Sequence, residues 1–193
     1  MSQPFLPQLL RGWLPPERYF RQFGAPVSLR LRGALSCTES LTRYMEEQTG
    51  QGVQVRLESQ TPLVNGPWDA ILWDHQQRLP PDSVILARSA WLHLAEREWL
   101  YAYAHSQVAV DHLSAAARAA IERGEEPLGS LFLEREGPVE RTDLELAEAH
   151  VPELARHLGH ASDRLYWCRR SLFRVNRVIR ARIFEIFLPD LWP

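Results

Sequence analysis

The C-terminal stretch 166–193 constrains the fold more than any other part of the chain. Residues 169–175 and 177–188 are rich in Val, Ile and Phe and flank a turn near Asn176, and Pro189 ends the second segment. Side chains alternate between the two faces of a strand, and both faces of 183–188 are apolar. We therefore expect a hairpin of two strands, the second of which is covered on both sides.

Glu185 is the only carboxylate in that apolar strand. A buried carboxylate needs a partner, usually an arginine or a donor on a ligand. The sequence leaves two interpretations open for it. In the first, Glu185 has a structural role only, in an ion pair or at an exposed strand end. In the second, it belongs to a ligand site.

Arg88 is a second charge in an apolar setting, because it follows the four apolar residues 84–87. It lies in the first strand of an expected hairpin, 83–94 with 98–110, in which it shares a face with Ala90 and Leu92. The alternative is an arginine at a strand margin that extends its charge into solvent.

The 193 residues, of which 45% are hydrophobic and 24% charged, suit one domain that spans 1–193. Pro4, Pro7, Pro15 and Pro16 predict an extended arm over 1–16. Strand-like segments and short helices then alternate, and hairpins dominate, which predicts the α+β class with an antiparallel sheet. The expected strands are 27–35 (a strand or a strand-like lead-in), 53–59, 83–94, 98–110, 142–150 and the final hairpin. The expected helices are one or two turns over 17–23, 38–48 with Thr38 as cap, 112–123 and 152–158.

Charge composition excludes several classes of function. The net charge of −2 provides no basic field for nucleic acid, and all 22 basic residues are arginines, which excludes Schiff-base lysines and a P-loop lysine. The arginines from Arg169 to Arg182 are most simply interpreted as a solvated strand face; RNA binding is the sharper alternative, but no aromatic platform accompanies them.

Cysteine and histidine spacing indicates no metal site. Cys37 and Cys168 are far apart, which is typical of free thiols in a cytoplasmic protein. His150, His157 and His160 form the only histidine cluster, but no carboxylate or cysteine completes a zinc-binding set. The first 16 residues are too short and too proline-rich for a signal peptide or a membrane span.

Four short stretches have a recognisable order: Ser40-Leu-Thr-Arg, Arg88 followed by Trp99, the expected tight turn Pro127-Leu128-Gly129, and Trp167-x-Arg169-Arg170-Ser171 followed by Glu185-x-Phe187-Leu188-Pro189. On these stretches, from about residue 36 to the end, the chain resembles the chorismate pyruvate-lyase family. The resemblance implies a six-stranded antiparallel sheet with helices on one face and an internal ligand site closed by helical flaps. It also implies a carbon–oxygen lyase that yields 4-hydroxybenzoate, a ubiquinone precursor, and pyruvate.

The resemblance also implies roles for individual residues. Arg88 would hold the aromatic carboxylate, the backbone at Leu41 and Leu128 would contact the ligand, and Glu185 would meet the ring oxygen as acid/base. No cofactor is implied, because aromatisation drives the elimination. The expected partner is a small molecule, without nucleic acid or membrane, and the chain would be a monomer or weak dimer.

One position departs from the family pattern. Tyr103 stands where the family has a second arginine that faces the substrate, and His105 is a further candidate wall residue. The alternative function is therefore a non-catalytic protein that binds a small aromatic acid on the same fold. In structural terms, Tyr103 could instead pack against Trp91 or Trp99 across the hairpin.

Overall fold

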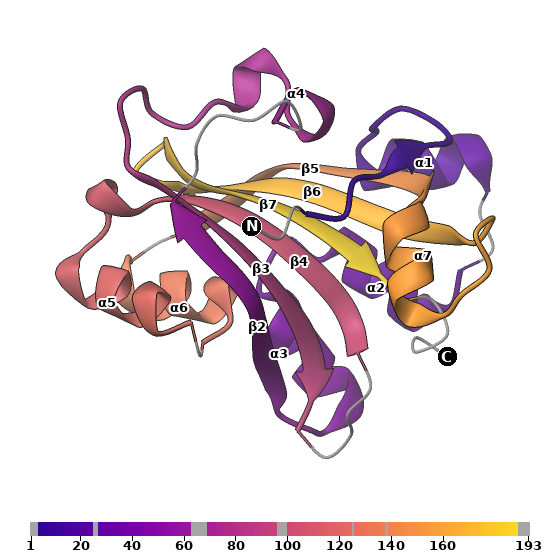
Figure 1. Cartoon of the computed structure of the whole chain (residues 1–193), viewed down its shortest axis with the longest axis horizontal. Helices are drawn as coiled ribbons and strands as arrows, with labels where there is room; N and C mark the ends of the chain where they lie inside the picture. The colour runs from indigo at the N-terminus through magenta and orange to yellow at the C-terminus, as the bar shows by residue number, and fades with distance from the viewer. Residues whose placement is uncertain are drawn as a thin grey trace.

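One antiparallel sheet organises the protein, in the order β1-β5-β6-β7-β4-β3-β2 (Figure 1). The computed structural model describes residues 4–24, 27–62, 69–95, 100–124, 126–137 and 139–188. The strands are β1 (Gln8–Leu9), β2 (Val53–Pro62), β3 (Ile85–Leu94), β4 (Leu100–Ala109), β5 (Val139–His150), β6 (Leu165–Val175) and β7 (Val178–Phe187). The helices are α1 (Pro16–Phe23), α2 (Leu29–Ser36), α3 (Leu41–Thr49), α4 (Asp69–Leu72), α5 (Ala115–Arg123), α6 (Leu128–Arg135) and α7 (Pro152–Leu158), with 3₁₀ turns η1 (His75–Gln77) and η2 (Val110–His112).

The expected α+β class with an antiparallel sheet is confirmed, with seven strands in place of six. The additional strand, β1, is two residues long and comes from the N-terminal arm, where Gln8 pairs with His150 of β5. No helix among the described residues has the length and apolar character needed to cross a membrane.

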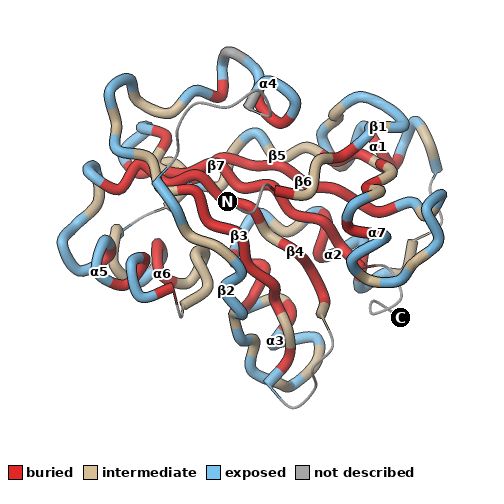
Figure 2. Tube along the Cα trace, viewed as in Figure 1, coloured by how far each residue is buried: buried red, intermediate tan, exposed pale blue. Residues whose placement is uncertain are grey.

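The β6–β7 hairpin lies in the middle of the sheet, as the apolar C-terminal stretch predicts. Asn176 and Arg177 both have positive φ, 51° and 66°, which suits a two-residue hairpin turn. Every residue from Ala181 to Leu188 is buried, so β7 is covered on both faces (Figure 2).

The two faces of the sheet are covered differently. Helices α1, α2, α3, α5 and α6 pack on the face that carries Arg88 and Glu185, which we call the helical face. The N-terminal arm, α4, the segment 73–79 and α7 pack on the opposite face. In Figure 1, α2 and α3 lie behind the sheet, and α7 and the N-terminal arm lie in front. The helices on one face that the resemblance implied are thus joined by α4 and α7 on the other.

Local capping explains two differences from the expected elements. Residues 27–35 were expected as a strand but form α2, because the Ser28 Oγ accepts a hydrogen bond from Leu31 N (3.1 Å) and starts a helix. Helix α3 begins after Ser40 and not at Thr38, since the Ser40 Oγ accepts from Arg43 N (3.3 Å). In both places a serine cap decides where the helix starts.

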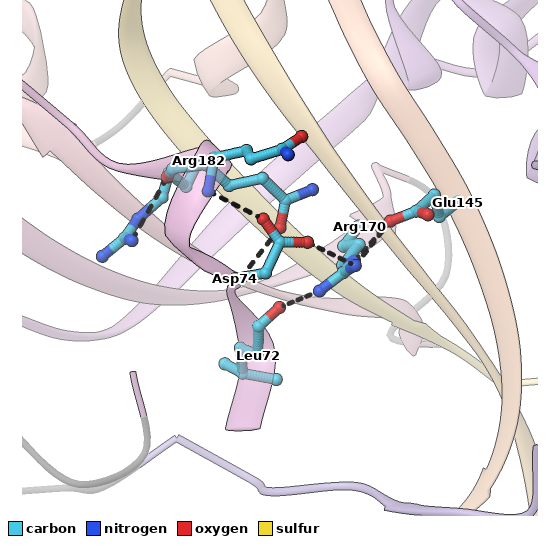
Figure 3. Close-up of polar contacts among 7 residues, drawn as sticks. Leu72, Asp74, Glu145, Arg170 and Arg182 are labelled. Carbon is cyan, nitrogen blue, oxygen red and sulfur yellow. Dashed lines mark hydrogen bonds and ion pairs between the residues drawn. The ribbon is translucent and has the colours of Figure 1, made fainter. Parts of the chain in front are cut away.

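Two buried arginines fasten the segment 72–77 to the opposite face (Figure 3). Arg170 donates to Glu145 Oε2 (2.7 Å) and Leu72 O (2.7 Å) and lies 3.4 Å from Asp74 Oδ2. Arg182 donates to Gln77 O (3.3 Å). Arg169, Arg170 and Arg182 are buried, so the expected solvated strand face is wrong for these three arginines, because β6 and β7 are central strands; Arg177 at the hairpin turn is exposed.

We expect Arg170→Met to release the segment 72–77 from the sheet. The substitution removes charge-assisted bonds worth about 1.5–3 kcal/mol, while the partly exposed Glu145 can be solvated. Amide hydrogen exchange in 72–77 should accelerate at least about tenfold. Arg174→Met on the same strand is the control, and equal exchange rates in both variants would contradict this role.

Candidate functional site

An internal pocket lies between the helical face of the sheet and the first turns of α3 and α6. Its lining residues are Ser40, Leu41, Thr42, Val55, Arg88, Ala90, Leu92, Ala104, Ser106, Pro127, Leu128, Gly129, Arg141, Ile183 and Glu185. The structure thus brings together Arg88, Glu185, Leu41 and Leu128. The free space is about 50 Å³, enough for a few water molecules, since one water needs about 10–15 Å³.

Arg88 is a buried cation without an acidic partner. It is 3% exposed, and among the described residues no carboxylate forms an ion pair with it. Its Nη2 donates to Gly124 O (2.8 Å) and to the backbone O of Glu126 (2.9 Å), whereas its buried Nε has no hydrogen-bond partner in the described part of the chain. Burial lowers the pKa of Arg88 to about 10, so the side chain stays charged at neutral pH. The buried Nε–H and a full positive charge are therefore left for a ligand.

Glu185 is held by a bidentate ion pair with Arg169. Arg169 Nε donates to Oε2 (2.6 Å) and Nη2 to Oε1 (2.9 Å), while Nη1 donates to Ala34 O (2.5 Å) and joins α2 to the sheet. Burial raises the pKa of Glu185, but the charges of Arg169 and Arg141 outweigh it, and the net pKa lies below its ordinary value. Glu185 is therefore ionised and can accept hydrogen bonds, but it is unsuited to act as an acid at neutral pH.

Arg141 is a buried cation of the pocket that the sequence did not reveal. Its side chain is 4% exposed, its Nη1 lies 3.5 Å from Glu185 Oε2, and its guanidinium lies 4.7 Å from the centroid of the Phe173 ring. Burial, followed by the charge of Arg169, lowers its pKa to about 10. Arg141 reaches the pocket only through the register of β5 against β6, where it stands opposite Phe173. No local pattern around it signals this position.

The N-terminal residues of two helices line the pocket. Leu41 and Leu128 are the first residues of α3 and α6, whose opening N–H groups have no acceptor within the helix. The tight turn expected at 127–129 is the start of α6, and its N-cap, Pro127, provides no side-chain acceptor. The free N–H groups and the positive helix ends both favour an anion in the pocket.

Tyr103 does not reach the pocket. Glu185 stands opposite Ala104 and Arg88 opposite Ser106, so Tyr103 points to the other face of β4. There its ring packs against Trp91 (5.1 Å between centroids) and its hydroxyl donates to Ser89 Oγ (2.9 Å). The expectation that Tyr103 binds the ligand is therefore wrong, because alternate residues of a strand face opposite sides of the sheet. The alternative expectation, an aromatic pair with Trp91 across the hairpin, is confirmed.

We expect Tyr103→Arg to destabilise the fold and to leave the pocket unchanged. A guanidinium in this aromatic cluster would be overpacked and unpaired, at a cost of about 1–3 kcal/mol in the free energy of unfolding. Tyr103→Phe, which keeps the ring and loses the hydroxyl that bonds Ser89, is the milder control. Chemical unfolding measures both variants, and a stable Tyr103→Arg protein with altered ligand affinity would contradict the assignment.

The histidines also lie away from the internal pocket. His105 is on the face of Tyr103, with Nδ1 3.0 Å from Ser89 Oγ, and burial together with the charge of Arg182 lowers its pKa to about 4. His157 stacks on Trp91, His160 bonds the Tyr166 hydroxyl (2.8 Å) and His150 contacts Arg164 O (3.3 Å). No cluster of three His, Cys, Asp or Glu side chains that could hold a metal exists among the described residues.

Comparison with known proteins places the fold. No family model matches the chain, and no curated protein matches it. The structure is similar to the effector domain of PhnF from Mycobacterium smegmatis (TM-score 0.55, 13% identity, over 79% of this chain and 90% of that chain). It is also similar to the ligand-binding domain of a putative GntR-family transcriptional regulator from Bordetella bronchiseptica (TM-score 0.51, 14% identity, over 72% of this chain and 83% of that chain). The possible transcriptional regulator YydK from Bacillus subtilis is similar over most of both chains (TM-score 0.53, 13% identity, over 92% of this chain and 93% of that chain).

At these identities the likeness establishes the fold alone. The fold is the chorismate-lyase-like fold that GntR-family effector domains share.

The expectation of a carbon–oxygen lyase is wrong. The similar structures are described as an effector domain, as the ligand-binding domain of a putative transcriptional regulator and as a possible transcriptional regulator, and not as lyases. The pocket argues against the acid part of the acid/base role expected for Glu185, because Arg169 and Arg141 keep this carboxylate ionised.

Proposed function

We propose that this chain binds a small aromatic carboxylic acid in the internal pocket and does not transform it. The observation that carries the proposal is Arg88, a buried guanidinium with no carboxylate partner among the described residues and with a free Nε–H. An unpaired buried cation is costly, and a ligand carboxylate is the natural counter-ion.

The remaining walls suit the rest of such a ligand. Leu41, Leu92, Leu128 and Ile183 give apolar surface for a ring. Ionised Glu185 keeps lone pairs beyond those used by Arg169, so a ring hydroxyl can donate to it. 4-Hydroxybenzoate combines the required groups: a carboxylate, a ring and a hydroxyl.

Entry of a ring requires the N-terminal ends of α3 and α6 to separate, because the free space of the internal pocket holds only a few waters. The hydroxyls of Thr42 and Ser130 lie 3.1 Å apart and join the two helix starts. This contact is small and polar, which supports a pocket that opens without loss of the core. The printed descriptions of the similar domains, effector and ligand-binding, support a binding role as well.

Thermal shift and titration calorimetry with four probes test the proposal. We expect 4-hydroxybenzoate and benzoate at millimolar concentration to raise the melting temperature, because they bind the folded state only. Benzamide and phenol, which lack the carboxylate, should have no effect. Absence of any shift and of any heat with both acids would overturn the proposal.

A further inference from the structure

A second cavity adjoins the internal pocket. It holds about 310 Å³ of free space and shares Ser40, Gly129 and Arg141 with the pocket. Its other lining residues are Thr38, Glu39, Arg43, Val139 and Phe173. Because the internal pocket is the smaller of the two, a ligand that enters it has room to continue past Arg141 into this adjoining cavity.

Arg141 stands at the boundary with an incomplete set of partners. Its Nε is buried and makes no hydrogen bond within the described part of the chain. Its Nη1 forms an ion pair with Glu185 Oε2 at 3.5 Å but makes no hydrogen bond among the described residues, and Arg169 already binds both oxygens of Glu185 at 2.6 and 2.9 Å. Arg141 therefore has buried donors without hydrogen bonds, and it shares the single carboxylate of Glu185 with Arg169.

The charges around the two cavities do not balance. Arg88, Arg141 and Arg169 are buried cations, and Glu185 is the buried carboxylate that faces them. At the rim, Glu39 and Arg43 are exposed and offset each other. Arg88 binds the backbone oxygen of Glu126, but the Glu126 carboxylate pairs with Arg135 at 2.7 Å and does not neutralise Arg88. Two positive charges thus remain without an anion.

We infer that the ligand carries two anionic groups, one bound by Arg88 in the internal pocket and the second bound by Arg141 from the adjoining cavity. The ligand class is an elongated dianion, an aromatic acid whose side arm bears a carboxylate or a phosphate. This inference rests on the proposed binding function and narrows it from a monoacid to a diacid.

Matched ligand pairs test the inference on the unmodified protein. Terephthalate is compared with 4-carbamoylbenzoate, and 4-(carboxymethoxy)benzoate with its side-arm amide, by titration calorimetry. At least one diacid should bind about tenfold or more tightly than its neutral-arm partner, because a second charge-assisted contact forms. A phosphate arm is tested with 4-(phosphonooxy)benzoate against 4-hydroxybenzoate. Equal affinities within all pairs would overturn the inference and leave the monoacid proposal standing, whereas no binding by any acid overturns both.

Variants locate the second contact. Arg141→Met should reduce the diacid preference to about one, because the second charge-assisted contact is lost. Arg43→Met, at the rim of the same cavity, should keep the preference. A preference that survives in folded Arg141→Met overturns the assignment. If Arg141→Met does not fold, Arg141→Gln, which keeps a donor without the charge, gives the same comparison.

Discussion

Arg169→Met is expected to lower the free energy of unfolding by about 3–5 kcal/mol, the largest stability effect of any variant considered. The substitution leaves Glu185 buried and ionised with Arg141 as its remaining cation, 3.5 Å away. It also removes the donor to Ala34 O and thereby the link between α2 and the sheet. Chemical unfolding followed by circular dichroism gives the magnitude.

Two further variants separate charge from packing in this effect. Arg177→Met, at the exposed turn of the same hairpin, should change stability by less than about 0.5 kcal/mol. The double variant Arg169→Met with Glu185→Leu should recover part of the loss, because it buries no unpaired carboxylate. A loss below about 1 kcal/mol in Arg169→Met would show that the ion pair is not a structural element.

The same ion pair predicts a pH dependence. Glu185 has a folded-state pKa below its ordinary value of 4.5, so the folded protein binds fewer protons than the unfolded chain near that pH. Its contribution is present above pH 4.5 and is lost as the pH falls through the folded-state pKa. The free energy of unfolding should therefore fall less steeply below pH 4.5 in Glu185→Gln than in the unmodified protein. Equal slopes would contradict the lowered pKa.

Arg88→Met is expected to weaken binding of 4-hydroxybenzoate about 10- to 100-fold, since a charge-assisted contact contributes about 1.5–3 kcal/mol. Stability should change little, because methionine fills similar space and no carboxylate is left unpaired. The lost bonds to Gly124 O and Glu126 O are offset by removal of a buried charge. Titration calorimetry and a thermal melt report the two properties separately.

The control for this variant is Arg118→Met on α5, which removes an exposed arginine paired with Glu122. It should bind the acid as the unmodified protein does. If Arg88→Met unfolds, or binds the acid with unchanged affinity, then Arg88 is a structural residue and the account of the pocket is wrong.

Two charged residues of the pocket could be predicted from local sequence, because each interrupts an apolar strand. Arg88 and Glu185 are single charges in apolar strand runs, and burial in a covered sheet makes such charges conspicuous. Ser40 and Pro127 mark helix starts, although the sequence placed one start at Thr38 and took the other for a turn. The capping side chain of Ser40 sets the first of these boundaries, whereas Pro127 starts α6 without a side-chain cap.

The rest depends on pairing between distant strands, which local patterns do not contain. Arg169 is the partner of Glu185 only because β6 and β7 pair in that register, and Arg141 arrives from β5. Tyr103 shows the cost of a one-residue error, since a shift by one residue moves a side chain to the other face of the sheet. The eight-residue α2 was missed because its alternating leucines and arginines resemble a strand, and the Ser28 cap decides otherwise.

The central claim is that Arg88 binds the carboxylate of a ligand. The NMR resonance of the Arg88 Nε–H tests this claim most directly. The ¹⁵N–¹H signal is assigned by its loss in Arg88→Met and followed during titration with 4-hydroxybenzoate and with 4-hydroxybenzamide. We predict a saturable downfield shift of this resonance with the acid and none with the amide, because only the acid provides a charged acceptor for the free Nε–H. The Arg169 Nε–H, already bound to Glu185, should move little. An unmoved Arg88 resonance at saturating acid, or equal shifts with acid and amide, would contradict the account.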